Sequence, residues 1–122
     1  MRFLDAIVAH REESSAQSLA KSLKEVFRSV RVVNSADQLR AAVAEKHTRL
    51  LITDLETVGL KKVEELRRDF GVAIVCVHRV PDEAMWAEAL NHGAIDCCHT
   101  SDIHGIVQAV LRNVMPARSN AA

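Results

Sequence analysis

Residues 51–66 read LITDLETVGLKKVEEL, and this stretch decides the fold. It continues the run Leu50–Thr53, whose residues lack the polar alternation of a half-exposed strand, as is typical of a strand buried on both faces. Apolar residues then recur at helical spacing, and a glycine follows where helices commonly end: Leu60, Val63, Leu66, Phe70 and Gly71. The stretch therefore predicts a strand, a loop that starts at Asp54, and a helix.

The same alternation continues on both sides of this unit. Two more continuous apolar runs, Ala6–Ala9 and Ala73–Val77, predict central strands. The run Val30–Val33 contains Arg31 and suits a sheet edge, and the short run Asp96–His99 predicts a fifth strand.

Helical periodicity separates the predicted strands. One apolar stripe is Leu19, Leu23, Val26, Phe27 and Val30, with Ser14 or Ser15 as cap; another is Ile103, Ile106, Val107, Val110, Leu111 and Val114, with Thr100 or Ser101 as cap. Ser35 and Gln38 form a capping box for a helix that contains Leu39 and Val43. Pro81 suits the first turn of a helix with Ala87 and Leu90 on its inward face.

Five strands in strict alternation with helices leave few topologies, because crossovers between parallel strands are short and right-handed. The expected fold class is α/β, a three-layer, doubly wound, five-stranded parallel sheet of order 2-1-3-4-5, as in flavodoxin-like proteins. Residues 1–114 form one domain in this interpretation, and residues 115–122 form a flexible tail or linker.

Composition excludes several classes of function. The chain of 122 residues has 16 Lys+Arg and 16 Asp+Glu, so bulk charge does not favour direct nucleic-acid binding. Aromatic residues make up 3%, too few for base-stacking platforms. Three cysteines, two of them adjacent, do not resemble a disulfide framework, and no apolar run has membrane length. We expect a cytoplasmic domain without membrane contact.

Function in such sheets lies beyond the carboxyl ends of the strands. The residues at these ends are His10 and Arg11 after the first strand, Asp54 after the third, His78 after the fourth, and His99 with Thr100 after the fifth.

The chain resembles the CheY-like receiver domain of bacterial two-component response regulators over residues 3–114. LITDLETVGLKKVEEL is similar to the strand, phospho-acceptor loop and helix of that family, with Asp54 at the acceptor position and Gly59 at the loop glycine. ALNHGAID, residues 89–96, is similar to the segment that leads into the fifth strand. The resemblance implies phosphorelay signal transduction, a histidine kinase partner, and transcription regulation through an attached output domain.

The sequence departs from this family at most of its functional positions. The acidic pair that holds Mg²⁺ is matched by Ala9-His10 or His10-Arg11, with Glu12 and Glu13 close behind. His78 matches the switch Ser/Thr, Cys97 the aromatic, Thr100 the phosphate-binding lysine, and Ser101 the proline that follows. We therefore predict a pseudo-receiver that acts by protein contact without Mg²⁺ or other cofactor and is not an enzyme.

Several alternatives remain open at this stage. A conventional receiver would be phosphorylated on Asp54 by a histidine kinase. If His10, Asp54, His78 and His99 converge, with Cys98 as a further donor, they offer ligands suited to zinc or another transition metal. Imidazoles beside a carboxylate also favour a pH response. A catalytic domain on the same scaffold is the weakest reading, since the sequence has no Gly-rich phosphate loop.

Trp86 and Met85 are the candidate interaction surface. Helical spacing places them on the flank or the exposed side of the fourth helix, and tryptophan is enriched where proteins bind one another. The receiver resemblance places dimer and partner contacts on this side of the fold, so a homodimer is one expectation. Packing of Trp86 over the edge of its own core is the competing one.

Overall fold

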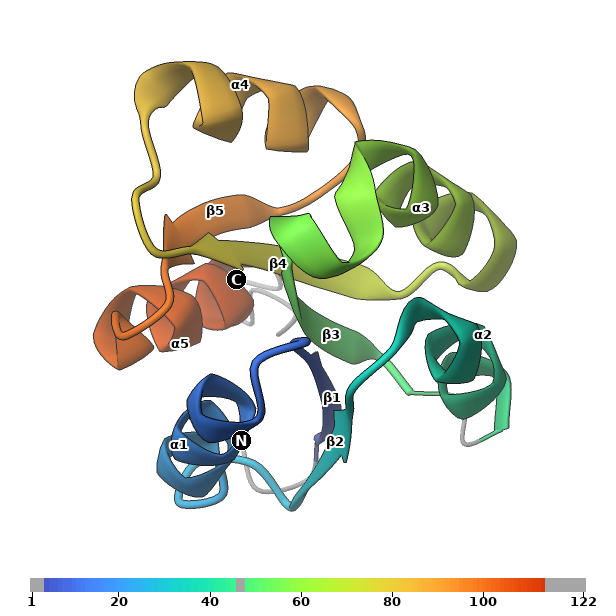
Figure 1. The fold of residues 1–122 in the computed structure, drawn as a ribbon, viewed down its shortest axis with the longest axis vertical. Coiled ribbons are helices and arrows are strands. Elements are labelled where there is room, and N and C mark those ends of the chain that lie inside the picture. Colours follow the sequence, from blue (N-terminus) through green and yellow to red (C-terminus); the bar gives the residue numbers. More distant parts are fainter. Residues whose placement is uncertain (1–3, 46–47, 114–122) are drawn as a thin grey trace, which may run out of the picture.

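The computed structural model describes residues 4–45 and 48–113. Its five parallel strands lie in the order β2-β1-β3-β4-β5, as the sequence predicts (Figure 1). The elements are β1 (Asp5–Ala9), α1 (Glu13–Leu23), β2 (Ser29–Val33), α2 (Ala36–Glu45), β3 (Leu50–Asp54), α3 (Leu55–Phe70), β4 (Ala73–His78), α4 (Glu83–Asn91), β5 (Asp96–His99) and α5 (Ile103–Asn113). Val114 and the expected tail, residues 115–122, lie outside the described residues.

The central strands are buried because helices cover both faces of the sheet. All five residues of β3 are buried, whereas β2, which pairs only with β1 among the described strands, exposes Ser29 and Arg31. The register pairs Ala9 of β1 with Thr53 of β3, and Asp54 of β3 with Val77 of β4. The ends of β1, β3 and β4 therefore lie side by side at one edge.

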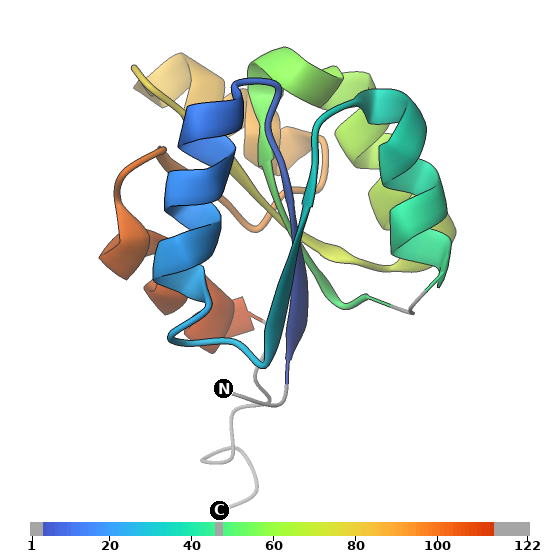
Figure 2. The same cartoon turned by 60° about the horizontal axis from the view of Figure 1, so that its bottom comes forward.

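Helices cover both faces of the sheet (Figure 2), and a separate apolar layer holds the helices on each face. On one face, Leu23 of α1, Phe27 of the segment after it and Ile106 of α5 pack in one cluster with Val8 and Ile52. On the other face, α2, α3 and α4 pack against alternate residues of the strands. The helices contribute Leu39, Val63, Leu66 and Ala89, and the strands contribute Ile7, Leu51 and Ile74. Successive strand residues point to opposite faces, so each run of apolar residues serves both layers.

The caps of three helices differ from the sequence prediction. Helix α1 begins at Glu13, one residue before the predicted serines, and its N-cap Glu12 makes no side-chain capping hydrogen bond within the described structure. Helix α4 follows Asp82, whose carboxylate accepts from the Met85 amide at 2.8 Å, so Pro81 precedes the cap. In α5 the carboxylate of Asp102 accepts from the Gly105 amide at 2.9 Å. An aspartate carboxylate therefore accepts from a first-turn amide in α4 and in α5, whereas the N-cap side chain of α1 accepts from none.

The inward face of α4 also differs from the prediction. Ala89 is buried and Met85 packs against the core, whereas Ala87 is exposed and Leu90 is half-buried. Apolar residues occur on most sides of this short helix, so spacing alone did not select one face.

The three cysteines are buried free thiols. Burial is the main cause that raises the pKa of Cys76 and of Cys98 to about 12, and it raises the pKa of Cys97 as well. They act as small apolar side chains of β4 and β5. No helix in residues 4–45 and 48–113 is long and apolar enough to span a bilayer.

The raised thiol pKa values predict lower stability in alkali. Above about pH 9 the unfolded chain releases thiol protons that the folded protein retains, so the unfolded state binds fewer protons. The free energy of unfolding should then fall with rising pH, by at most about 1.4 kcal/mol per pH unit for each thiol. Urea unfolding at about pH 8 and about pH 10 measures this change.

A double variant, Cys76→Ala with Cys98→Ala, is the control for other alkaline titrations. It should be less stable through lost packing, but its stability should fall less steeply above about pH 9. Equal slopes in the original chain and in this variant would contradict the prediction.

Candidate functional site at the carboxyl edge of the sheet

Asp54 lies at the centre of the edge and its carboxylate is already engaged. The residue ends β3, forms the N-cap of α3 and is 3% exposed. Its Oδ1 accepts from the Glu56 amide at 3.1 Å, and its Oδ2 accepts from the Thr57 hydroxyl at 3.0 Å. Both oxygens therefore stabilise the first turn of the helix that follows.

Gly59 explains how this turn can sit over the strand end. Its φ of 74° and ψ of 162° interrupt the helical backbone between the first turn and the rest of α3. A side chain is strained at such a φ, so glycine suits this position. The predicted loop after Asp54 is thus a short helical turn, residues 55–58, that holds Glu56 and Thr57 over the edge.

His10, the residue directly after β1, faces Asp54. The residue is 8% exposed, and its Nε2 lies 3.9 Å from Asp54 Oδ2. Its Nδ1 accepts from the Glu12 amide at 3.1 Å. Of the residues matched to the family's acidic pair, His10 is therefore the one that faces the aspartate.

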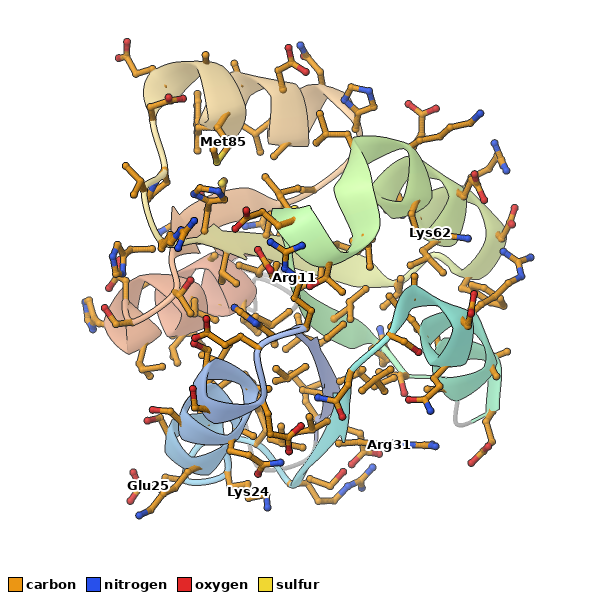
Figure 3. The ribbon with its side chains drawn as sticks, viewed as in Figure 1. Arg11, Lys24, Glu25, Arg31, Lys62 and Met85 are labelled. Carbon is orange, nitrogen blue, oxygen red and sulfur yellow. The ribbon has the colours of Figure 1, made fainter. Side chains whose placement is uncertain are left out.

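Arg11 and His78 converge on Glu56, which the sequence analysis did not single out. An Arg11 guanidinium nitrogen lies 3.2 Å from Glu56 Oε2, and His78 Nε2 lies 3.7 Å from Glu56 Oε1. The Arg11 amide also donates to the Thr57 hydroxyl at 2.9 Å, and Figure 3 shows Arg11 beneath the start of α3. The sequence offered one indication that Glu56 belongs to the site: the residue lies in the predicted loop that starts at Asp54.

A cavity of about 540 Å³ opens beside Asp54, between α1 and the β5–α5 loop. Of the predicted site residues it is lined by His10, Arg11, Glu12, Asp54, His99 and Thr100, whereas His78 does not line it. One face of α1 contributes Ser14, Ser18 and Ser22, which were not predicted as a group although their spacing of four places them on one helix face.

The candidate metal ligands are not gathered around one point. In residues 4–45 and 48–113, no three His, Cys, Asp or Glu side chains are placed to hold a metal ion. His10 faces Asp54, His78 faces Glu56, and the Nδ1 of His99 accepts from the Ser101 amide at 3.0 Å. The zinc alternative built on these four residues is therefore not formed.

Trp86 and Met85 lie in different environments on α4. Trp86 is 47% exposed and its indole N–H donates to Asp96 Oδ1 at 3.0 Å, while Arg112 lies 3.5 Å from Asp96 Oδ2. Met85 lies on the side of α4 toward the sheet and packs against the core (Figure 3). Trp86 alone remains a candidate for an interaction surface on this helix.

Comparison with solved structures identifies the fold as that of response-regulator receiver domains. A two-component response regulator from Clostridium difficile superposes with a TM-score of 0.76 and 16% identity, over 92% of this chain and 98% of that one. FixJ-N gives a TM-score of 0.76 and 24% identity over 92% and 94%. A LuxR-family DNA-binding response regulator from Staphylococcus aureus gives 0.76 and 14% over 90% and 98%.

No protein-family model matches the sequence, and no curated protein matches it. The likeness is therefore one of architecture, and it agrees with the resemblance seen in the sequence around Asp54.

The engaged carboxylate predicts a structural cost when Asp54 is replaced. Asp54→Ala should lower the free energy of unfolding by about 1–2 kcal/mol, because the Glu56 amide and the Thr57 hydroxyl lose their acceptor. Asp54→Asn should cost less, since its amide oxygen can still accept from one of them. Urea unfolding of the two variants tests this order, and equal losses would contradict the capping role.

Proposed function

We propose that this domain is a receiver-like signalling module that acts through protein contacts without Mg²⁺-assisted phosphorylation of Asp54. One observation carries the proposal: His10, not a carboxylate, faces Asp54 across the site, and both oxygens of Asp54 accept hydrogen bonds from its own helix. A phosphorylated receiver needs these oxygens free to react and to share a metal ion with nearby carboxylates.

The cations of the site support the same proposal. Phosphoryl transfer depends on positive charge placed where the phosphoryl oxygens develop charge. Arg11 is paired with Glu56, and Thr100 occupies the position that the family resemblance gives to a lysine. Arg79 lines the cavity but is exposed. The site therefore has few cations positioned for the reaction.

The proposed partners follow from the receiver-like fold. A neighbour such as the LuxR-family DNA-binding response regulator has an output function, which supports a second domain or a separate protein as the reader of this one. Trp86 on α4 is the apolar anchor we propose for such a contact or for a homodimer. We further propose a cytoplasmic location, because three buried free thiols suit a reducing compartment.

Incubation with a small phosphodonor and Mg²⁺, followed by intact mass measurement, tests the proposal. We expect no adduct of about 80 Da, the mass of one phosphoryl group. An adduct that forms with Mg²⁺ and is absent in Asp54→Ala would instead establish the conventional receiver, in which a histidine kinase is the natural partner.

A gain-of-function variant serves as the positive control. His10→Asp, Arg11→Asp and Thr100→Lys together restore the two carboxylates and the lysine that the family resemblance implies. This triple variant should acquire the Mg²⁺-dependent adduct on Asp54 under conditions in which the original chain does not. The comparison isolates the missing groups from the fold, which both proteins share.

A further inference from the structure

Three histidines at the carboxyl edge hold their loops with the same hydrogen bond. In each, Nδ1 accepts from the backbone amide two residues further along the chain. The bonds are Glu12 N–H to His10 at 3.1 Å, Val80 N–H to His78 at 2.9 Å, and Ser101 N–H to His99 at 3.0 Å. The β1–α1, β4–α4 and β5–α5 loops are therefore held in the same way.

This bond determines where the imidazole proton sits. A nitrogen that accepts a hydrogen bond from an amide has no proton of its own, so in the neutral ring the proton is on Nε2. The Nε2 atoms of His10 and His78 lie 3.9 Å from Asp54 and 3.7 Å from Glu56. Each of these two rings thus joins a loop amide on one side to a carboxylate on the other.

A second proton would remove the hydrogen bond on one side of the ring and strengthen the attraction to the carboxylate on the other side. It must bind Nδ1, which then becomes a donor and can no longer accept from the loop amide. The nearby carboxylate, in contrast, attracts the imidazolium more strongly than the neutral ring. Protonation therefore exchanges a loop hydrogen bond for an ion pair with Asp54 or Glu56.

Other charged groups also lie around these rings. Glu12, in the loop of His10, binds the Ser15 hydroxyl, and Glu56 is shared between His78 and Arg11. Arg79 follows His78 and lines the cavity with His99. At Nδ1 of His99 the Ser101 hydroxyl also lies at 2.8 Å, so two donors compete with a proton there.

His92, away from this edge, provides an internal contrast. Its Nδ1 lies 2.8 Å from the carbonyl oxygen of Glu88. A carbonyl oxygen only accepts, so this Nδ1 carries the proton and Nε2 is free to bind another. Protonation of His92 therefore leaves its hydrogen bond intact.

We propose that the carboxyl edge responds to protons, and that protonation of His10, His78 and His99 releases the three loops together. This inference rests on the proposed function, because it names the input of the same site: a proton in place of a phosphoryl group. The loops of His10 and His78 are linked through Arg11 and Glu56, so release of one affects the other. The surface that a partner meets at this edge then differs between neutral and mildly acidic solution.

Nitrogen NMR of the ¹⁵N-labelled full chain tests the bonds directly, since a coupling between two nitrogens passes across an N–H···N hydrogen bond. While the rings are neutral we expect this coupling between Nδ1 of the three histidines and the amides of Glu12, Val80 and Ser101, and we expect it to disappear as added acid protonates the rings. A proton found on Nδ1 of the neutral rings, or couplings that persist after the rings are protonated, would overturn the proposal.

A matched variant separates the histidines from other acid effects. In His10→Asn, His78→Asn and His99→Asn combined, each side-chain oxygen can accept from the same amide, as in an Asx turn, but does not titrate. The amides of Glu12, Val80 and Ser101 should then keep their neutral-pH resonances throughout the titration, whereas His92→Asn should respond as the original chain does. If the combined variant does not fold, each single variant reports on its own loop.

A failure of the proton response can be distinguished from a failure of the proposed function. An Asp54 adduct with a phosphodonor would refute phosphorylation-independent signalling but leave the nitrogen couplings unaffected. Loop amides that shift equally in the asparagine variant and in the original chain would refute the proton response alone.

Discussion

The hydrogen bonds from the Glu56 amide and the Thr57 hydroxyl to Asp54 are the constraint on which the rest of the site depends. They join the end of a fully buried strand to the first turn of α3, and Gly59 lets that turn break from the helix behind it. Glu56 and Thr57 are thereby placed where Arg11 reaches both. The Asp54 carboxylate, with two donors and a histidine beside it, is held in place.

The carboxylates at the carboxyl edge of the sheet face basic side chains and imidazoles. Here Arg11 and His78 face Glu56, and His10 faces Asp54, so the carboxylates have partners from the chain itself. His10 and His78 thereby bring two imidazoles to this edge. Both proposals rest on these contacts.

Much of the fold could be predicted from sequence because its signals are local and repeated. Continuous apolar runs mark strands covered on both sides, and the helix that ends at Gly71 shows the expected spacing. Prediction was weaker where several residues could serve equally well. Glu12, Asp82 and Asp102 occupy capping positions assigned to nearby residues, and α4 turns Met85 and Ala89 inward in place of Ala87. Such choices depend on packing that spacing does not encode.

By itself the sequence determined the β-α alternation, the strand order, and the presence of histidines where carboxylates were expected, because each depends on residue type and position along the chain. Only the tertiary structure decided which of these residues meet. It placed His10 against Asp54 and His78 against Glu56, and within residues 4–45 and 48–113 it did not gather the four candidate metal ligands around one point. It also showed which imidazole nitrogen faces a loop amide. Distances between residues far apart in sequence follow from sheet register and side-chain rotamers, which no local pattern specifies.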